Sequence, residues 1–306
     1  MKPLFLLVIV TTLCASCSLR TESVRAESAA VIDVHLHAGP SSHRDESDDA
    51  QVRRRLKELD EHGVVAAIVG GPPADVERMR RAAPKRLIGS VAFPCSDGLD
   101  PNLFECFEAG GDWPDLQWLR KEVDAGRIGA LGELYNVYAG ISPSDPRMTP
   151  YFDLAAEYDL VVLAHSDSGP PPQGRVRGCC PNFDGDLGRP GRFEAPLTRH
   201  PQLRLVLFHV FRPGFVEEAI DLMNRYPNVM VETSPMTRAP RTLVYAALEA
   251  FIDAGHGDRI VFGSDYGGQV GGSLNVIELA SFLSPGEKRA ILYDNAARLL
   301  GIESKP

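Results

Sequence analysis

Short apolar segments alternate with longer amphipathic segments along most of the chain. The apolar segments are rich in Val, Ile and Leu, and several lack polar alternation. That pattern is typical of strands buried on both faces of a parallel sheet. It predicts strands over residues 30–37, 64–70, 86–93, 128–134, 160–165, 203–209, 229–233 and 259–264.

Amphipathic segments fill the intervals between these strands. Residues 49–62 place Val52, Leu56 and Leu59 on one face, and Gly63 then ends the helix. The same pattern predicts helices over residues 75–83, 115–125, 148–158, 215–226, 241–254, 273–283 and 285–300. Strands that alternate with helices in this way favour a single (β/α)8 TIM barrel. The first strand is not followed by Gly-x-Gly-x-x-Gly, which weakens the alternative of an open dinucleotide-binding sheet.

Two long segments interrupt the alternation. Residues 94–114 follow the third predicted strand, and residues 166–192 follow the fifth. Loops at the C-terminal ends of barrel strands carry the active site in this fold, and long loops are often functional. We therefore expect both loops to lie over a functional site.

Composition narrows the class of protein. With 306 residues, 44% of them hydrophobic, the chain can bury the core of one barrel of roughly 250 residues. Length alone would also allow two smaller domains. The net charge of −9 argues against nucleic acid or an anionic membrane surface as the main partner. A small-molecule substrate is expected, and a homo-oligomer is compatible with the sequence.

The N-terminus is typical of an export signal. Lys2 precedes an apolar run over residues 4–13 that is too short to span a bilayer but suits a signal-peptide core. Leu13-Cys14-Ala15-Ser16-Cys17 resembles a bacterial lipobox. This predicts a signal peptide over residues 1–17, cleavage before Cys17 and a lipid anchor on that cysteine.

Cleavage near residues 26–30 is the alternative to lipidation. It would give a periplasmic or extracellular protein instead of a membrane-anchored lipoprotein. In the first case polar residues 18–29 would form a flexible tether. The barrel domain is expected over residues 30–302.

The six cysteines do not form a disulfide scaffold in a chain of this length. A disulfide between Cys95 and Cys106 is compatible with an exported protein. Cys179 and Cys180 are adjacent in sequence, and we do not expect them to be joined to each other. Outside the signal region, which holds Cys14 and Cys17, no Cys-x-x-Cys spacing predicts a structural zinc site.

The motif His35-Leu36-His37 ends the first predicted strand. Side chains at positions i and i+2 of a strand point to the same face, so both imidazoles can bind one ion. Four later strands also end in a metal-binding residue: Glu133, His165, His209 and Asp265. Barrel strands collect such residues at one face, and imidazole with carboxylate suits a divalent metal. Zinc is expected first, with manganese, iron or nickel as alternatives.

Taken together, these motifs resemble the amidohydrolase superfamily of metal-dependent hydrolases. The shared features are His-x-His on strand one, His on strands five and six, and Asp on strand eight. Residues 31–37 and 260–265 are similar to its amidohydrolase-related ("amidohydrolase 2") branch. The resemblance spans roughly residues 30–302.

The resemblance implies a role for each of these residues. His35, His37 and Asp265 would bind the more buried metal, and Asp265 would also act as the general acid and base. His165 and His209 would bind a second metal, or touch the substrate in a one-metal site. Glu133 stands where relatives have a bridging carboxylated lysine or a glutamate, so a glutamate-bridged pair of metals is expected.

Three functions remain open at this point. The leading hypothesis is an exported hydrolase, in which one or two metals activate water to cleave an ester, lactone, amide or phosphoester bond. The first alternative is a one-metal decarboxylase or lyase of the same superfamily, and the second is an inactive, lipid-anchored binding protein. Candidates for substrate binding are Arg175, Arg177 and Arg212, because guanidinium groups at a barrel mouth suit a carboxylate or phosphate. Tyr135 is a further candidate, because it follows Glu133 closely and is expected to line the pocket.

Overall fold

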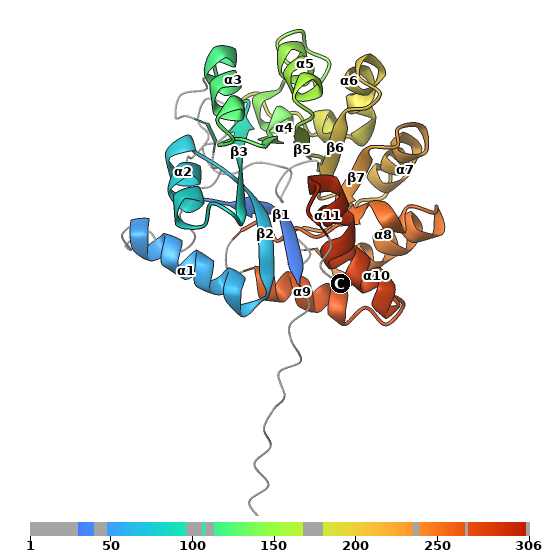
Figure 1. Ribbon diagram of the computed structural model, residues 1–306. Helices are drawn as coiled ribbons and strands as arrows, with labels where there is room; N and C mark the ends of the chain where they lie inside the picture. The colour runs from blue at the N-terminus through green and yellow to red at the C-terminus, as the bar shows by residue number, and fades with distance from the viewer. Residues whose placement is uncertain are drawn as a thin grey trace, which may run out of the picture.

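The structure is a computed structural model that describes residues 30–39, 48–95, 106–107, 113–167, 180–234, 239–266 and 269–303. Its eight strands form one parallel sheet in the order β1 to β8, and helices surround the sheet (Figure 1). The predicted (β/α)8 TIM barrel is confirmed. Within the described residues, no helix is long and apolar enough to cross a membrane.

Every predicted strand is present. The strands are β1 (Val31–His37), β2 (Val64–Gly70), β3 (Leu87–Phe93), β4 (Ala130–Leu134), β5 (Val161–His165), β6 (Arg204–Phe208), β7 (Val229–Glu232) and β8 (Ile260–Val261). β8 is shorter than predicted because only its first two residues pair with β7. The chain then leaves that ladder and hydrogen-bonds to β1 instead.

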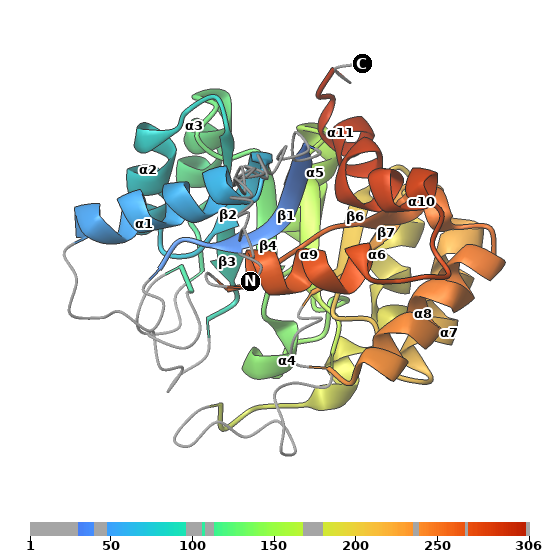
Figure 2. The ribbon, with the colours of Figure 1, turned by 90° about the horizontal axis from the view of Figure 1, so that it is seen from below.

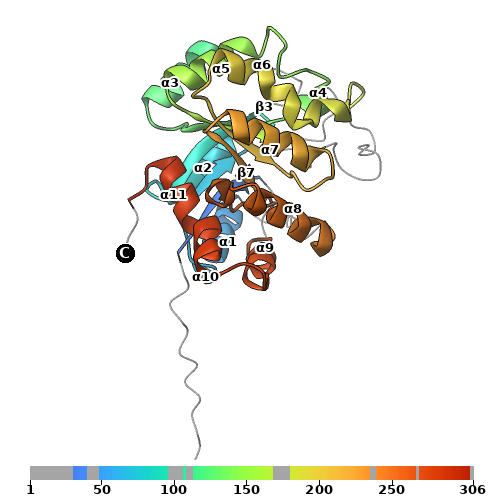
Figure 3. The same cartoon turned by 90° about the vertical axis from the view of Figure 1, so that its right-hand side faces the viewer.

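Most predicted helices are also present, with small changes at their ends. The helices are α1 (Asp48–Glu61), α2 (Pro73–Ala82), α3 (Leu116–Asp124), α4 (Asn136–Ala139), α5 (Thr149–Glu157), α6 (Glu194–Arg199), α7 (Phe215–Arg225), α8 (Arg241–Asp253), α9 (Val270–Glu278), α10 (Pro285–Arg289) and α11 (Asn295–Leu300). Figure 3 shows α7 and α8 side by side on the outside of the barrel.

Two predictions about helices were wrong, and two short helices were missed. The helix expected over 273–283 begins earlier, at Val270, because Val270 and Ile277 are buried against the barrel. The helix expected over 285–300 is divided by a π-helical turn between α10 and α11. The short helices α4 and α6 were not predicted, since they have too few residues to show a helical period.

The core has two layers on the two faces of the sheet. The inner layer includes Ile32, Val34, Ile68, Leu163 and Phe208, which fill the barrel interior, and α11 packs against it. The outer layer joins the other face of the strands to the surrounding helices. Parallel strands buried on both faces therefore explain the continuous apolar runs of the sequence.

An irregularity in β1 decides where its histidines point. Ile32 and Val34 belong to the inner layer, but Leu36 belongs to the outer layer. The pairing of β1 with β2 changes register between Asp33 and Leu36. Such a bulge re-aims the side chains that follow it. As a result, His35 and His37 both face the interior at the C-terminal end of the strand.

The barrel closes at a seam between β1 and the segment after β8. The N–H of Val34 donates to the carbonyl of Phe262 at 3.0 Å, and the N–H of Asp265 donates to the carbonyl of His35 at 2.8 Å. The N–H of His37 then donates to the carbonyl of Asp265 at 3.1 Å. The first and last candidate metal ligands of the sequence are thus neighbours.

The long loops after β3 and β5 are only partly described. Cys95 and Cys106 form a disulfide with their Cα atoms 5.7 Å apart. Cys180 is disulfide-bonded as well, while Cys179 lies outside the described residues. Cys95, Cys106 and Cys180 belong to a small hydrophobic cluster with Tyr135 and Tyr138. Figure 2 shows α4 apart from the ring of helices, at one end of the barrel.

Candidate metal centre

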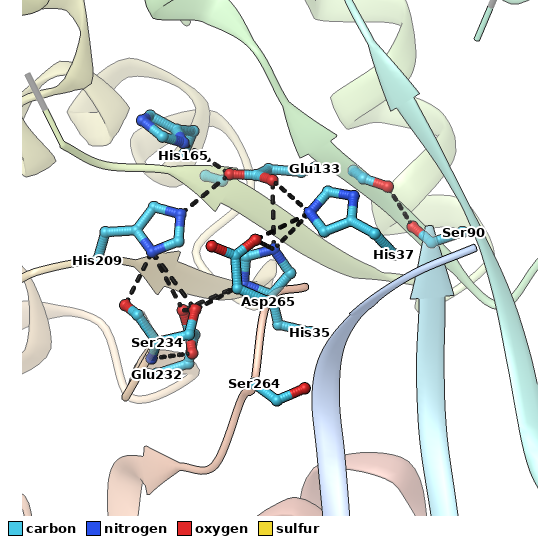
Figure 4. A network of polar contacts seen from close by, with 12 residues as sticks. His35, His37, Ser90, Glu133, His165, His209, Glu232, Ser234, Ser264 and Asp265 are labelled. Carbon is cyan, nitrogen blue, oxygen red and sulfur yellow. Dashed lines mark hydrogen bonds and ion pairs between the residues drawn. The ribbon is translucent and has the colours of Figure 1, made fainter. Parts of the chain in front are cut away.

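Six side chains from the ends of five strands meet at the C-terminal face of the barrel (Figure 4). All are buried, with no more than 8% of any residue exposed. We call this group the candidate metal centre; its members are His35, His37, Glu133, His165, His209 and Asp265. The structure therefore brings together every residue that the sequence predicts as a metal ligand.

The first half of the centre comes from β1 and the seam. The Nε2 atoms of His35 and His37 lie 3.1 Å apart. Asp265 Oδ1 lies 3.1 Å from His37 Nε2 and 3.6 Å from His35 Nε2. Three ligand atoms from these residues thus lie close enough together to hold one ion.

Glu133 lies between this half and a second pair of imidazoles. Its Oε2 atom is 3.2 Å from His35 Nε2 and 3.4 Å from His37 Nε2. Its Oε1 atom is 2.6 Å from His165 Nδ1 and 3.3 Å from His209 Nε2. Each oxygen of the carboxylate therefore faces a different pair of histidines.

Unusual backbone conformations place three of the six ligands. Gly132, just before Glu133, has φ of +134°, and a Cβ there would lie 2.2 Å from the carbonyl oxygen of Leu163. His209 and Asp265 have φ of +63° and +71°. Non-glycine residues rarely adopt positive φ, and such conformations concentrate at functional sites.

The network is strongly coupled electrostatically. Burial alone would lower the pKa of His35, but Glu133, Glu232 and Asp265 outweigh it and raise the pKa to about 9. In the same way, burial is outweighed at His209, chiefly by Glu133, and its pKa rises to about 10. These carboxylates favour positive charge at the centre, where a divalent cation would be stabilised.

The two carboxyl groups respond in the opposite direction. Burial would raise the pKa of Glu133, but His35 and two further imidazoles hold it well below its usual value. Burial is likewise outweighed at Asp265, where the hydrogen bond from His37 contributes most to lowering the pKa. Both side chains are therefore carboxylates at neutral pH and can act as metal ligands.

The donor set fits a divalent metal. Imidazole nitrogen and carboxylate oxygen are the ligands that zinc and its neighbours prefer in proteins. Two groups of buried ligand atoms each lie within 4.8 Å of one another: one formed by His35, His37 and Asp265, the other by His35, Glu133 and His209. So dense a group of buried charges costs energy unless it is paired, which an ion would accomplish.

Two residues of β7 and its end also reach the centre, although the sequence did not single them out. Glu232 Oε1 lies 3.2 Å from His35 Nδ1, and Ser234 Oγ lies 2.9 Å from the same atom. The carbonyl oxygen of Ser234 accepts from His209 Nδ1 at 2.8 Å. The position of Glu232 at the end of a buried strand was the available signal.

Two tyrosines pack on the histidines of the centre. The hydroxyl of Tyr138 lies 3.4 Å from His165 Nε2, and burial raises the pKa of Tyr138 well above its usual value. The ring of Tyr266 stacks on that of His37 at 4.9 Å between centroids. Neither contact was predicted, because the conformations at the ends of β4 and β8 are not visible in the sequence.

The predicted substrate-binding residues are placed differently. Tyr135 is 2% exposed and packs in the cysteine cluster. Arg212 is partly exposed and forms an ion pair with Asp167, which follows β5. Arg175 and Arg177 lie outside the described residues.

Several solved structures have the same fold at low sequence identity. A probable 2-pyrone-4,6-dicarboxylic acid hydrolase from Acinetobacter baumannii, with citric acid bound, matches with a TM-score of 0.62 and 15% identity over 89% of this chain and 99% of its own. An amidohydrolase from Burkholderia multivorans with bound zinc has a TM-score of 0.60 and 16% identity, covering 90% of this chain and 100% of its own.

A decarboxylase is similar to the same extent. The dihydroxybenzoic acid decarboxylase from Polaromonas, with bound manganese and the inhibitor 2-nitroresorcinol, has a TM-score of 0.57 and 15% identity. It covers 89% of this chain and 97% of its own. At such identities these structures share the fold with this chain, and they include both hydrolases and decarboxylases.

Sequence comparison identifies the family. No curated protein matches the chain. The family described as amidohydrolase matches residues 32–302, which run from β1 to just beyond α11 and include all six residues of the candidate metal centre. The chain belongs to the amidohydrolase family.

Proposed function

We propose that the protein is a metal-dependent hydrolase with a two-metal centre bridged by Glu133. The observation that carries the proposal is the position of this carboxylate. Oε2 faces His35 and His37, whereas Oε1 faces His165 and His209. A carboxylate placed between two sets of ligands suits a bridge between two ions.

The ligands divide into two sets around this bridge. His35, His37 and Asp265 would hold one ion, and His165 and His209 the other. When bound, such ions supply a Lewis acid and lower the pKa of a water molecule, which favours attack on an electrophilic carbon or phosphorus. The bond cleaved would be an ester, lactone, amide or phosphoester bond of a small molecule.

Asp265 is the residue best placed to move the proton. Its carboxylate lies at the centre, 3.1 Å from His37 Nε2. Its pKa is lowered, so it is ionised, and in that form it has the lone pair needed to accept the proton of the attacking water. The same group can then donate that proton to the leaving atom. Because no residue of the candidate metal centre is more than 8% exposed, bulk water is largely kept away from its side chains.

A one-metal decarboxylase is the second candidate, and one observation favours it. The two groups of close ligand atoms share His35, and the group of His35, His37 and Asp265 is sufficient for a single ion. In that case Glu133, His165 and His209 would contact the substrate instead of a second ion.

Metal content per chain separates the two candidates. Elemental analysis of protein purified without chelators should give about two transition-metal ions per chain. Glu133→Gln should lower the content toward one and abolish hydrolysis of nitrophenyl ester and phosphoester probes. One ion in the wild type, together with release of CO₂ from aromatic carboxylates, would support the decarboxylase. No ion after reconstitution with zinc and manganese would refute both.

A further inference from the structure

Glu232 and Ser234 are not candidate ligands themselves, but they contact two residues that are, His35 and His209. They lie at the end of β7, between His35 on β1 and His209 after β6 (Figure 4). Glu232 is 1% exposed and Ser234 is fully buried. Their polar atoms face the Nδ1 atoms of both rings, on the side opposite Glu133.

The hydrogen bond to the backbone at His209 fixes a proton on Nδ1. A backbone carbonyl can only accept, so His209 Nδ1 must donate to Ser234 at 2.8 Å. With its proton on Nδ1, the neutral ring presents the lone pair of Nε2 to the centre. Nε2 is the atom that lies 3.3 Å from Glu133.

His35 is held in the same way by side chains. Ser234 Oγ donates to Glu232 Oε1 at 2.5 Å, and Ser234 N–H donates to Glu232 Oε2 at 2.6 Å. With its proton used, Ser234 Oγ can only accept from His35 Nδ1, as can the carboxylate of Glu232. His35 therefore also carries its proton on Nδ1 and turns Nε2 toward the centre.

The surrounding backbone is shaped to hold this carboxylate. A Cβ at Gly263 would lie 2.2 Å from Glu232 Oε2 and 2.9 Å from His35 Cβ. Only glycine leaves room there for both side chains. The ring of His35 is further fixed by stacking on Phe208, with centroids 3.9 Å apart.

We propose that Glu232 and Ser234 are positioning residues that fix the Nδ1–H tautomer and the orientation of His35 and His209, so that both rings present Nε2 to the ions. The proposal rests on the proposed function in so far as it needs a metal at the centre. It concerns the rings that bind the ion, whichever bond the enzyme breaks. Partners of this kind orient metal-binding histidines and raise their basicity.

Glu232→Gln is the sharpest variant because it keeps the shape of the side chain. A glutamine amide cannot accept hydrogen bonds from both Ser234 N–H and His35 Nδ1–H, since only one of its two terminal atoms is an oxygen and the other is the nitrogen of an NH₂ donor. We expect zinc affinity, measured by competition with a chromophoric chelator, to fall about 10- to 100-fold. Ser234→Ala leaves Glu232 and the backbone carbonyl in place and should lower zinc affinity several-fold. This variant tests the proposal if Glu232→Gln does not fold.

NMR provides a readout that loss of stability alone would not change. In ¹H–¹⁵N spectra of the zinc-loaded wild type, His35 and His209 should each show a protected Nδ1–H and a metal-bound Nε2. In Glu232→Gln the His35 signal should be lost, whereas that of His209 should remain because a backbone carbonyl holds it.

Thr233→Val is the matched control. Thr233 is as buried as Glu232 and lies on the same segment, but its Oγ1 accepts from Gly263 and touches neither ring. It should keep wild-type zinc affinity. The inference is overturned if Glu232→Gln binds zinc as tightly as the wild type with an intact His35 signal, or if Thr233→Val loses as much affinity. A content of one ion per wild-type chain would refute the two-metal hydrolase, but the effect of Glu232→Gln on zinc affinity and on the His35 signal could still be measured at that single ion.

Discussion

Ser264 donates two hydrogen bonds to Asp33 across the seam of the barrel. Its Oγ donates to Oδ2 at 2.6 Å, and its N–H donates to Oδ1 at 3.1 Å. Oδ1 also accepts from the N–H of His35 at 3.0 Å. One buried carboxylate thus ties the residue before Asp265 to the start of the His-x-His motif and helps to set the spacing between candidate ligands from the first and last strands.

Removal of this carboxylate should weaken both the fold and the metal site. Asp33→Ala leaves three buried donors without their acceptor, so we expect the free energy of unfolding of the metal-free protein to fall by about 3 kcal/mol. Ser264→Ala removes only one of these bonds and should cost about 1 kcal/mol. Denaturant unfolding measures both values, and equal losses in the two variants would contradict the central role of Asp33.

Gly132 should not tolerate a side chain. Its φ of +134° and the 2.2 Å approach of a Cβ to Leu163 mean that Gly132→Ala must displace β4 or β5. We expect a loss of about 3 kcal/mol or more, together with loss of metal, because Glu133 is the next residue. Gly126→Ala is the control: it has φ of +66° but open space around it, and it should cost about 1 kcal/mol with metal content unchanged.

The regular part of the fold was visible in the sequence, and the irregular part was not. Continuous apolar runs such as residues 64–70 predicted β2 at the bounds that it has. The residues that leave this regularity, including the bulge of β1, the positive φ of His209 and the short β8, depend on contacts between distant segments. Local propensity carries no information about such contacts.

The same division applies to the site. The six candidate ligands could be named because all of them lie at strand ends, two on β1 and one at each of four later strands, and barrel topology places these ends together. Glu232 and Ser234 were missed because their role depends on hydrogen bonds across β1, β6 and β7. Arg212 illustrates the reverse: it lies near the mouth as expected, but its ion pair with Asp167 could not be inferred from sequence.

Asp265→Asn tests the proton transfer in the proposed mechanism. The amide can still occupy the site but cannot accept a proton, so we expect kcat to fall about 10²- to 10⁴-fold. In the wild type, kcat should fall at acidic pH as Asp265 becomes protonated, and this acidic limb of the pH profile should be absent from the variant. Asp258→Asn, an exposed change just before the same strand, should leave kcat unaltered. A variant of Asp265 with near-normal kcat would rule out this role.

Zinc binding should release protons. With pKa values of about 9 and 10, His35 and His209 are protonated near neutral pH in the metal-free protein. Each must lose a proton to bind an ion, so we expect release of about two protons per fully loaded chain. Calorimetric titrations with zinc in buffers of different ionisation enthalpy measure this number, and a value near zero would contradict it.

The stability of the metal-free protein should fall at alkaline pH. The folded pKa values of both rings lie above the ordinary value of 6.5. Their contribution to stability is therefore complete below about pH 6.5 and is lost as the pH rises through about 9 and 10. Bound zinc replaces these protons, so the difference in Tm between loaded and metal-free protein should widen from pH 7 to pH 10. A difference in Tm that stays constant over this pH range would argue against the raised pKa values of His35 and His209.

Arg212 should affect substrate affinity more than stability. Its ion pair with Asp167 is partly exposed, so Arg212→Gln should change the free energy of unfolding by less than about 1 kcal/mol. If the substrate is an anion, KM should rise about 10-fold or more, with little change for a neutral ester. Arg147→Gln, at an exposed arginine paired with Asp145, is the matched control. Equal KM values for charged and neutral probes would remove Arg212 from the binding site.

The seam also has a consequence for the order in which the site is assembled. Asp265 enters the barrel through backbone hydrogen bonds to His35 and His37, yet in the chain it comes 230 residues after His35. During synthesis the N-terminal ligands are made long before the strand that completes them. A nascent or C-terminally truncated chain therefore has an open barrel and an unfinished coordination site. The proposed ligand set that includes Asp265 would therefore be complete only after the last strand of the barrel has been made.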